Sequence, residues 1–206
     1  RGEAIRCLAE SGFLGIALDF SPDATVMAHE TLRRAAGPLR ASGVLGFATK
    51  LPLASGSVGV VLLLDVVEHL AAVDLWRALG EAKRVLAPGG ALVVHTSPNL
   101  WYYRFGYPLY RALERLRGHE LPKDPRDRNP WLKPMHVNEQ TPRTLRRSLR
   151  AAGFDVRRLL LRPADPAPGE PDRRLRRLLG WVAGLPGLRN VLCNDIFAVA
   201  CPESRR

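Results

Sequence analysis

Three side chains that can exchange protons follow a single apolar segment of the chain. The segment Val58–Leu64 reads Val-Gly-Val-Val-Leu-Leu-Leu, and Asp65, Glu68 and His69 come shortly after it. A continuous apolar run between turn residues predicts a strand buried on both faces, whose carboxyl end then carries these polar groups. Ligands bind at that edge of open α/β sheets. The sequence therefore predicts a ligand-binding edge just after residue 64.

A further acidic residue ends an earlier apolar segment. Residues 13–18 predict a buried strand that leads into Asp19, and we interpret Gly2, before the first helix, as the last glycine of a cofactor-binding loop. An acidic residue at such a strand end accepts hydrogen bonds from the ribose hydroxyls of an adenosine-type cofactor. A turn-forming aspartate is the alternative. Position alone does not separate a nicotinamide dinucleotide from S-adenosylmethionine, because both present a ribose diol.

Helices and strands alternate along the rest of the chain. Ser21-Pro22 and Thr141-Pro142 predict helix starts, because serine and threonine cap free amides and proline is tolerated at the first helical position. The expected helices cover 2–10, 21–36, 75–86, 109–116, 141–153 and 172–185, and the expected strands cover 13–18, 44–48, 58–64, 91–96, 154–161 and 196–200. This alternation predicts an α/β fold with a mostly parallel sheet and helices on both faces.

Composition narrows the class of protein. The three cysteines have no metal-type spacing, which favours free thiols in a reducing, cytoplasmic compartment, and we expect no metal site. The sequence contains no run of about 18 apolar residues, so we do not predict a membrane span. The net charge is +11, but the arginines scatter over expected helix faces without an aromatic-studded basic stripe. We therefore do not expect nucleic acid as a substrate or partner.

Several motifs together resemble a known family. They are Gly-Ile-Ala-Leu-Asp-Phe-Ser-Pro (15–22), Leu-Pro-Leu-Ala-Ser-Gly-Ser (51–57), Asp-Val-Val-Glu-His (65–69), Arg-Val-Leu-Ala-Pro-Gly-Gly (84–90), Thr-Pro (141–142) and Ala-Gly-Phe (152–154). In order and spacing they resemble the successive motifs of the class I S-adenosylmethionine-dependent methyltransferases. The resemblance covers residues 1 to about 162 and is greatest for the small-molecule branch that includes the ubiquinone and menaquinone biosynthesis enzymes.

The resemblance implies a Rossmann-like sheet of order 3-2-1-4-5-7-6 and S-adenosylmethionine as the cofactor. It also implies a role for each of five residues. Asp19 should hold the ribose, Phe20 should flank the adenosine, and Ala48 should meet the adenine through its backbone. Asp65 and Val66 should face the methionine part of the cofactor. The alternative for Asp65 is a capping role at the start of the next helix.

The chain also departs from the family pattern. Phe47 stands where an aspartate commonly contacts the adenine amino group, and Gly59 replaces the aspartate that usually opens the fourth strand. The first strand and most of the glycine loop are missing, with only Gly2 in place of the loop. We therefore expect an amino-terminal truncation of a longer enzyme, in which the strands beside the missing one lose a partner. Residues 1–206 alone should then bind the cofactor poorly.

We expect a single domain over 1–206. The resemblance divides it into a cofactor-binding half (1–97), a lid or substrate insertion (98–140) and a carboxy-terminal part (141–206) that contains a helix, two strands and a basic amphipathic helix. A 206-residue chain with 46% hydrophobic residues suits one such core. A long excursion like 98–140 is usually functional in a compact domain.

Two histidines are candidate bases for the reaction that the resemblance implies. The sulfonium already activates the methyl group, so the protein mainly aligns the acceptor for in-line displacement. A hydroxyl acceptor needs a general base within hydrogen-bond reach. His136, at the end of the 98–140 segment, is the first candidate and His69 the second, with a structural role as the alternative for each. His29, His95 and His119 rank lower.

The acceptor is the least determined part of this prediction. Aromatic residues gather in one segment, which suits an aromatic or amphipathic acceptor or a lid that packs on its own domain: Trp101, Tyr102, Tyr103, Phe105, Tyr107 and Tyr110. The basic amphipathic helix over 172–185 suits peripheral contact with an anionic bilayer or docking on the sheet. We expect O- or C-methylation of a small-molecule or lipid-like acceptor. A noncatalytic binding module of the same fold, or an inactive fragment, is the alternative.

Overall fold

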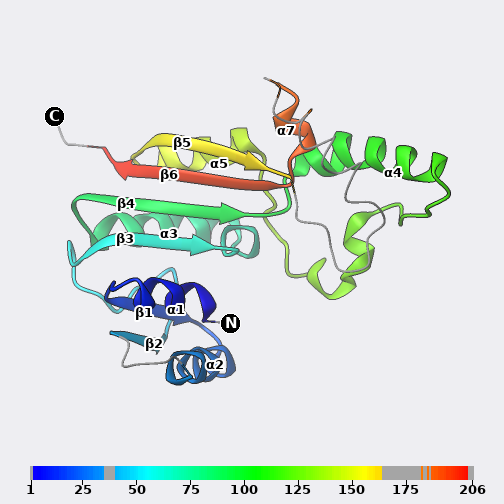
Figure 1. The fold of residues 1–206 in the computed structure, drawn as a ribbon. Helices are drawn as coiled ribbons and strands as arrows, with labels where there is room; N and C mark the ends of the chain where they lie inside the picture. The colour runs from blue at the N-terminus through cyan, green and yellow to red at the C-terminus, as the bar shows by residue number, and fades with distance from the viewer. Residues whose placement is uncertain (1, 35–39, 164–181, 183–184, 186, 204–206) are drawn as a thin grey trace. The chain divides into compact units, whose positions relative to one another are not determined.

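The computed structural model describes residues 2–34, 40–163, 182, 185 and 187–203. They form an α/β protein that divides into two compact units, Arg1–Ala54 and Ser55–Arg206 (Figure 1). The predicted α/β class is confirmed. The expected single domain and its three parts stay a prediction.

The first unit contains a pair of parallel strands. Strand β1 (Gly15–Asp19) pairs with β2 (Ala41–Leu45) along its whole length, so that Asp19 lies opposite Leu45. Helix α1 (Glu3–Glu10) precedes β1, and α2 (Pro22–Arg33) connects the two strands. These elements give the first unit a β-α-β arrangement whose carboxyl edge carries Asp19.

Two local features of this unit bear on the predictions. Ser21 caps α2 as expected, because its hydroxyl oxygen accepts a hydrogen bond from the backbone N–H of Ala24 at 3.3 Å. The second strand ends at Leu45 rather than at residue 48. The backbone N–H of Lys50 donates to the carbonyl of Phe47 at 3.0 Å, and this tight turn removes residues 47 and 48 from the strand.

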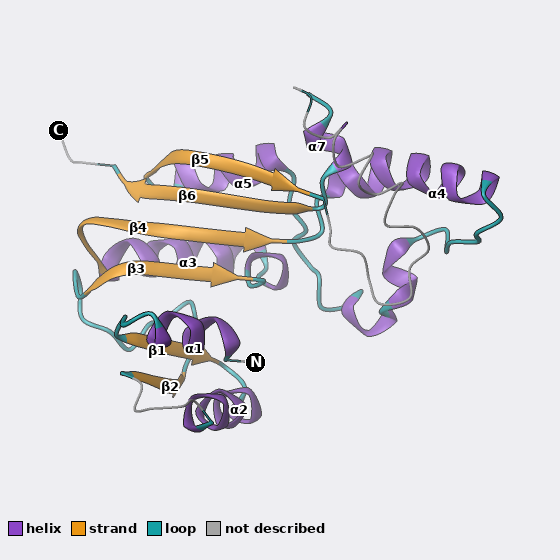
Figure 2. Ribbon diagram, viewed as in Figure 1, coloured by secondary structure: helices purple, strands orange, loops and turns teal. Residues whose placement is uncertain are grey.

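The second unit is built on a four-stranded sheet. Figure 2 shows its strands in the order β3-β4-β6-β5, with β3 and β4 parallel and β6 antiparallel to both of its neighbours. Their bounds are β3 (Val58–Leu64), β4 (Leu86–Thr96), β5 (Phe154–Arg162) and β6 (Asp195–Pro202). In the strand numbering of the expected order 3-2-1-4-5-7-6, the first unit thus reproduces the part 3-2, and the second unit reproduces the part 4-5-7-6.

The core of the second unit lies between the sheet and two helices. Helices α3 (Ala72–Val85) and α5 (Pro142–Ala151) share one buried cluster with the sheet. Leu63 belongs to this cluster and is 8% exposed, whereas Leu62 and Leu64 are each 38% exposed. The prediction that β3 is buried on both faces is therefore wrong. The described helices cover only the face that carries Leu63.

The segment after β4 is anchored by a buried amide. The side-chain N–H groups of Asn99 donate to the carbonyls of Asn190 and Cys193, each at 2.8 Å, beside helix α7 (Arg189–Leu192). A Cβ atom on Gly106 would lie 2.0 Å from the carbonyl oxygen of Val191, so only glycine allows this approach. The segment continues as a π-helical turn η2 (Tyr102–Gly106), α4 (Tyr107–Leu116) and the short 3-10 turns η3 (Pro125–Arg128) and η4 (Pro130–Leu132).

The predicted basic helix over 172–185 lies outside the described residues, apart from Val182 and Leu185. Its proposed contact with a bilayer is therefore not tested. Within the described part of the chain, every helix is too short or too polar to cross a membrane.

Loss of the cap on α5 should destabilise the second unit measurably. The Thr141 hydroxyl oxygen accepts from the backbone N–H of Thr144 at 3.0 Å, and the Thr144 hydroxyl accepts from the backbone N–H of Thr141 at 2.8 Å. We expect Thr141→Ala to lower the free energy of unfolding by about 1 kcal/mol in urea denaturation. Ser148→Ala, inside the same helix, is the control. An equal effect of both substitutions would contradict the capping role.

Candidate active site

The parallel pairing of β3 and β4 brings two groups of polar side chains to one edge. Leu64 lies opposite His95, and the backbone N–H of Asp65 donates to the carbonyl of His95 at 3.1 Å. Glu68 and His69 follow in the 3-10 turn η1 (Val67–His69). The two strands therefore end side by side, at the edge where the sequence predicts that a ligand binds.

Asp65 and His95 form an ion pair at this edge. Asp65 has a φ of 53°, and its Oδ1 lies 2.9 Å from Nδ1 of His95. The hydrogen bond with Asp65 raises the pKa of His95, while burial of the ring opposes it. Asp65 does not cap the next helix, because α3 follows Ala71 without a side-chain cap. Its carboxylate holds the histidine of the neighbouring strand instead.

Glu68 is a buried carboxyl group behind this pair. It is 2% exposed, and its Oε2 accepts a hydrogen bond from the Thr96 hydroxyl at 2.7 Å. Burial raises the pKa of Glu68, while its hydrogen bonds lower it by less. The carbonyl of Glu68 also accepts from the backbone N–H of Asn138 at 3.0 Å. This bond fixes the end of the 98–140 segment at the strand edge.

The two histidines predicted as bases lie against each other. The rings of His69 and His136 meet edge to face with centroids 4.8 Å apart. Nδ1 of His69 lies 3.1 Å from the carbonyl of Met135, and Nδ1 of His136 lies 3.5 Å from Oε1 of Glu139. Burial and the neighbouring His69 lower the pKa of His136. The structure thus brings both histidines to Glu68, and their role as bases stays a prediction.

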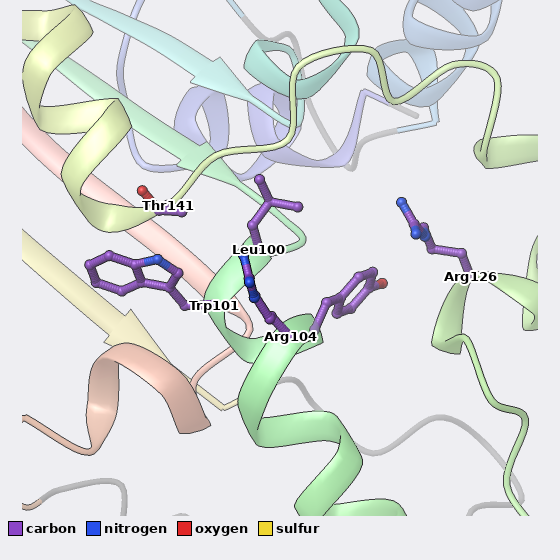
Figure 3. Close-up of a pocket in the computed structure, with 6 residues that line it drawn as sticks. Leu100, Trp101, Arg104, Arg126 and Thr141 are labelled. Carbon is purple, nitrogen blue, oxygen red and sulfur yellow. The ribbon is translucent and has the colours of Figure 1, made fainter.

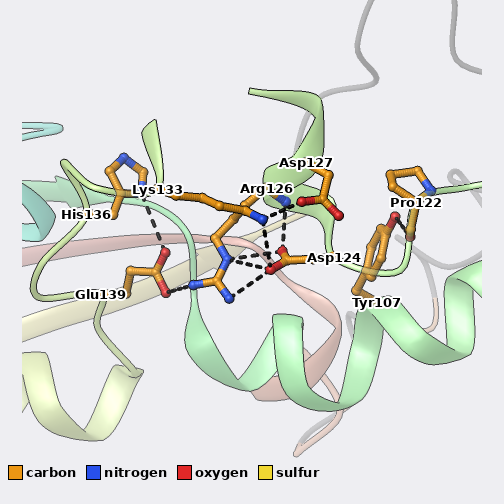
Figure 4. A network of polar contacts seen from close by, with 8 residues as sticks. All are labelled: Tyr107, Pro122, Asp124, Arg126, Asp127, Lys133, His136 and Glu139. Carbon is orange, nitrogen blue, oxygen red and sulfur yellow. Dashed lines mark hydrogen bonds and ion pairs between the residues drawn. The ribbon is translucent and has the colours of Figure 1, made fainter. Parts of the chain in front are cut away.

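A network of charges supports His136 from the other side (Figure 4). Arg126 lies between two carboxylates, with 3.0 Å from its Nη2 to Oδ2 of Asp124 and 3.3 Å from its Nη1 to Oε2 of Glu139. The guanidinium lowers the pKa of Asp124, whereas burial raises the pKa of Glu139. Lys133 pairs with Asp127 in the same network. The network holds Glu139 in place beside His136.

A pocket with an aromatic wall adjoins this network. Its volume is about 360 Å³. Figure 3 shows the residues that line it, which are Leu100, Trp101, Tyr103, Arg104, Arg126 and Thr141. Burial raises the pKa of Tyr103, so this phenol remains protonated at physiological pH. Of the other aromatic residues noted in the sequence, Tyr107 and Tyr110 are buried and Phe105 is exposed. Only part of the aromatic segment therefore faces the pocket.

Three predicted cofactor residues lie at the ends of elements in the first unit. Asp19 is half-buried, and its Oδ1 accepts from the backbone N–H of Ser21 at 2.9 Å. Phe20, next to it, is 69% exposed. Gly2 has a φ of 87°, and a Cβ atom there would lie 2.9 Å from Cα of Ala28. Gly2 thus permits close packing of α1 on α2.

The remaining cofactor residues divide between the two units. Phe47 is 63% exposed and Ala48 is half-buried in the turn after β2. Asp65 and Val66 belong to the second unit, where Val66 packs against the core. A single cofactor site made of Asp19 in the first unit and Asp65 in the second stays a prediction.

Sequence reasoning missed four residues that the structure adds to the strand edge. His95 and Thr96 end β4, while Arg126 and Glu139 hold the histidine from the 98–140 segment. The pairing of the two apolar strands in parallel was a usable signal for His95, because their carboxyl ends must meet. Nothing in the spacing pointed to Arg126 and Glu139.

The family comparison matches less than half of the chain, at its amino-terminal end. A family model described as a methyltransferase domain matches residues 1–94. No curated protein matches the chain. The matched range includes the predicted ribose-binding Asp19 and the strand edge at Asp65, and it stops before His95.

Solved structures with the same fold cover almost the whole chain. The protein bound to the Trm112 methyltransferase activator in a Haloferax volcanii complex is 21% identical, with a TM-score of 0.64 over 98% of this chain and 79% of that one. An S-adenosylmethionine-dependent methyltransferase from Methanosarcina mazei is 14% identical, with a TM-score of 0.63 over 96% and 86%. These structures show the Rossmann-like class I methyltransferase fold.

The same fold also occurs in an enzyme with another activity. The 4+2 cyclase SpnF is 16% identical, with a TM-score of 0.60 over 98% of this chain and 71% of that one. Fold alone therefore does not assign the reaction. Together with the family match, the methyltransferase neighbours support S-adenosylmethionine as the cofactor.

The ion pair at the strand edge should control the titration of His95. We expect Asp65→Asn to lower the pKa of His95, because the amide keeps the shape but cannot stabilise the imidazolium as a carboxylate does. Asparagine tolerates the positive φ of this position. A histidine NMR titration measures the change, with Asp74→Asn on α3 as the control. An unchanged His95 titration would contradict the pairing.

Glu68 should make stability depend on pH. The raised pKa of Glu68 means that the folded state binds the carboxyl proton more tightly than the unfolded state does. The contribution of this proton to the free energy of unfolding is therefore complete below the ordinary pKa of 4.5, and it is lost as the pH rises through the folded-state pKa. We expect Glu68→Gln to gain stability relative to the natural protein across that window. The gain is about 1.4 kcal/mol for each pH unit in the window.

Urea unfolding of both proteins at a series of pH values measures this difference. Glu120→Gln, at an exposed glutamate, is the matched control. A stability difference between Glu68→Gln and the natural protein that is independent of pH would show that Glu68 titrates alike in the folded and unfolded states.

Proposed function

We propose that the protein is an S-adenosylmethionine-dependent methyltransferase that acts on a small-molecule or lipid-like acceptor by O- or C-methylation. The observation that carries this proposal is the position of Asp19. Its carboxylate ends a parallel strand inside the matched range 1–94, and the Ser21 N–H occupies Oδ1. Among the described residues no hydrogen bond reaches Oδ2, so this oxygen is available to a ribose hydroxyl.

The other proposed cofactor contacts follow the family assignment. The exposed Phe20 and Phe47 offer aromatic faces to an adenosine, and the Ala48 backbone lies in the turn between Phe47 and Lys50. Gly2 allows α1 to begin close to α2, and Asp65 with Val66 would face the methionine part.

On the acceptor side, the second unit provides the proton-handling groups. The cofactor would supply an activated methyl group, and the protein would orient the acceptor for in-line attack. We propose that His136, with His69 beside it, receives the proton of a hydroxyl acceptor. Its lowered pKa supports this role, because a base must be neutral before it takes up a proton.

The acceptor class is proposed from the pocket. Trp101 and Tyr103 give it aromatic surface, and Arg104 adds an exposed cation. This lining suits an aromatic acceptor of the ubiquinone-precursor kind, in keeping with the branch that the motifs resemble. A cytoplasmic location, with peripheral bilayer contact through 172–185, completes the proposal, and liposome sedimentation at low and high salt tests that contact.

A noncatalytic module of this fold is the second candidate. It is favoured by Phe47, which replaces a common adenine contact, and by the occurrence of the fold in the cyclase SpnF. One neighbour is bound to an activator protein, and a protein partner of this kind is compatible with either candidate. Formation of S-adenosylhomocysteine in the presence of phenolic acceptors would support the enzyme. A protein that binds the cofactor without any turnover would support the module.

Asp19 should dominate cofactor binding in the first unit. We expect Asp19→Asn to weaken S-adenosylmethionine binding about tenfold, equivalent to about 1.4 kcal/mol, because the amide is a weaker acceptor for ribose hydroxyls than a carboxylate. Equilibrium dialysis at high cofactor concentration measures this even when binding is weak. Asp23→Asn, at an exposed aspartate four residues away, is the control. Equal binding by both variants would reject Asp19 as the ribose ligand.

A further inference from the structure

We propose that Glu68, His69 and His136 form a binding site for a divalent transition-metal ion such as Zn²⁺. One candidate ligand atom from each of the three side chains lies within 4.8 Å of the other two. Two imidazoles and one carboxylate are a ligand set that zinc and related ions take in proteins. The site deepens the proposed function, because it lies where that function places the acceptor.

The polar contacts around the three side chains prepare them as ligands. Nδ1 of His69 faces the carbonyl of Met135, so this nitrogen carries the proton and Nε2 keeps a free lone pair. Nδ1 of His136 lies 3.5 Å from Oε1 of Glu139, an ion-pair distance that is longer than a hydrogen bond. Metal-binding histidines commonly donate their other ring N–H to a carbonyl or carboxylate.

Glu68 is oriented by a comparable contact. The Thr96 hydroxyl donates to Oε2, which fixes the carboxyl group. Glu68 is 2% exposed, and burial of a carboxylate is costly without a cation beside it. A metal ion would supply that cation. Three side chains from two distant parts of the sequence thus each offer one candidate ligand atom.

The spacing requires little movement. Ligand atoms around a tetrahedral zinc ion lie about 3.4 Å apart, given bond lengths of about 2.0–2.1 Å. Closing the widest separation of 4.8 Å then takes a shift of about 0.7 Å in each of two side chains. The partly exposed imidazoles can make such a shift by small side-chain rotations, while Glu68 remains fixed.

Three protein ligands leave one coordination position open. A bound divalent ion would polarise an acceptor hydroxyl placed there and increase its acidity, so His69 and His136 would act as ligands rather than as bases. Sequence spacing did not suggest this site, because His136 is far along the chain from Glu68 and His69. The bond from Asn138 to the Glu68 carbonyl brings them together.

Metal titration of the natural, tag-free protein tests the site directly. We expect binding of one Zn²⁺ per chain, seen in competition with a chromogenic chelator and as shifts of the His69 and His136 ring resonances in NMR spectra. The resonances of His29 and His119 should stay unchanged. Co²⁺ should bind without a thiolate charge-transfer band, which excludes the cysteines as ligands. Zinc binding that leaves both His69 and His136 resonances unshifted, or no binding, would overturn the proposal.

Variants then test the ligand assignment. We expect His69→Ala and Glu68→Gln each to weaken Zn²⁺ binding by about 100-fold or more, and Thr96→Val to weaken it by about 10- to 100-fold through loss of the orienting bond. His29→Ala, at an exposed histidine of the first unit, is the control and should bind like the natural protein. Natural affinity in His69→Ala would overturn the proposal. If a variant fails to fold, the NMR titration of the natural protein decides whether the metal site exists.

The two proposals can fail separately. Zinc affinity does not depend on Asp19, and cofactor binding in the first unit does not depend on His69. A protein that binds Zn²⁺ at this site but shows no difference between Asp19→Asn and Asp23→Asn would retain the metal site and lose the proposed cofactor site. The reverse result would reject the metal site alone.

Discussion

The parallel pairing of β3 with β4 is the constraint on which the candidate site depends. Parallel strands end at the same edge, so the polar residues that follow β3 must meet the residues that end β4. The backbone bond between Asp65 and His95 closes this edge, and the positive φ of Asp65 turns the chain into the 3-10 segment that carries Glu68 and His69. An antiparallel pair would separate these groups.

Burial of Glu68 links this edge to the distant segment that ends at residue 140. A buried carboxyl group must find hydrogen-bond donors, and Thr96 supplies one from the neighbouring strand. The carbonyl of the same residue binds Asn138, so the chain around His136 is fixed to the turn after β3. Arg126 and Glu139 then support the histidine from outside the sheet. The proton-handling groups are thereby held by backbone bonds as well as by side chains.

Sequence alone predicted elements whose signals are local. Thr141-Pro142 and Gly153 bound α5 as expected, because caps and turns depend on neighbouring residues. The burial of β3 was predicted wrongly, since an apolar run does not reveal whether helices cover one face or both. His95 was ranked low because its partner Asp65 lies 30 positions earlier and only strand pairing brings them together. Long-range contacts of this kind have no local pattern.

The family match covers less than half of the chain. It ends at residue 94, so it includes the predicted cofactor residues and stops one residue before His95. Thr96, Arg126, His136 and Glu139 lie beyond it, although Thr96 and His136 contact Glu68 and His69 inside it. The same fold occurs in the cyclase SpnF, so the fold does not dictate what these residues act on. The acceptor chemistry must therefore be argued from the contacts between residues 95–140 and the turn after β3, where the buried Glu68 carboxyl group and the imidazoles of His69 and His136 converge.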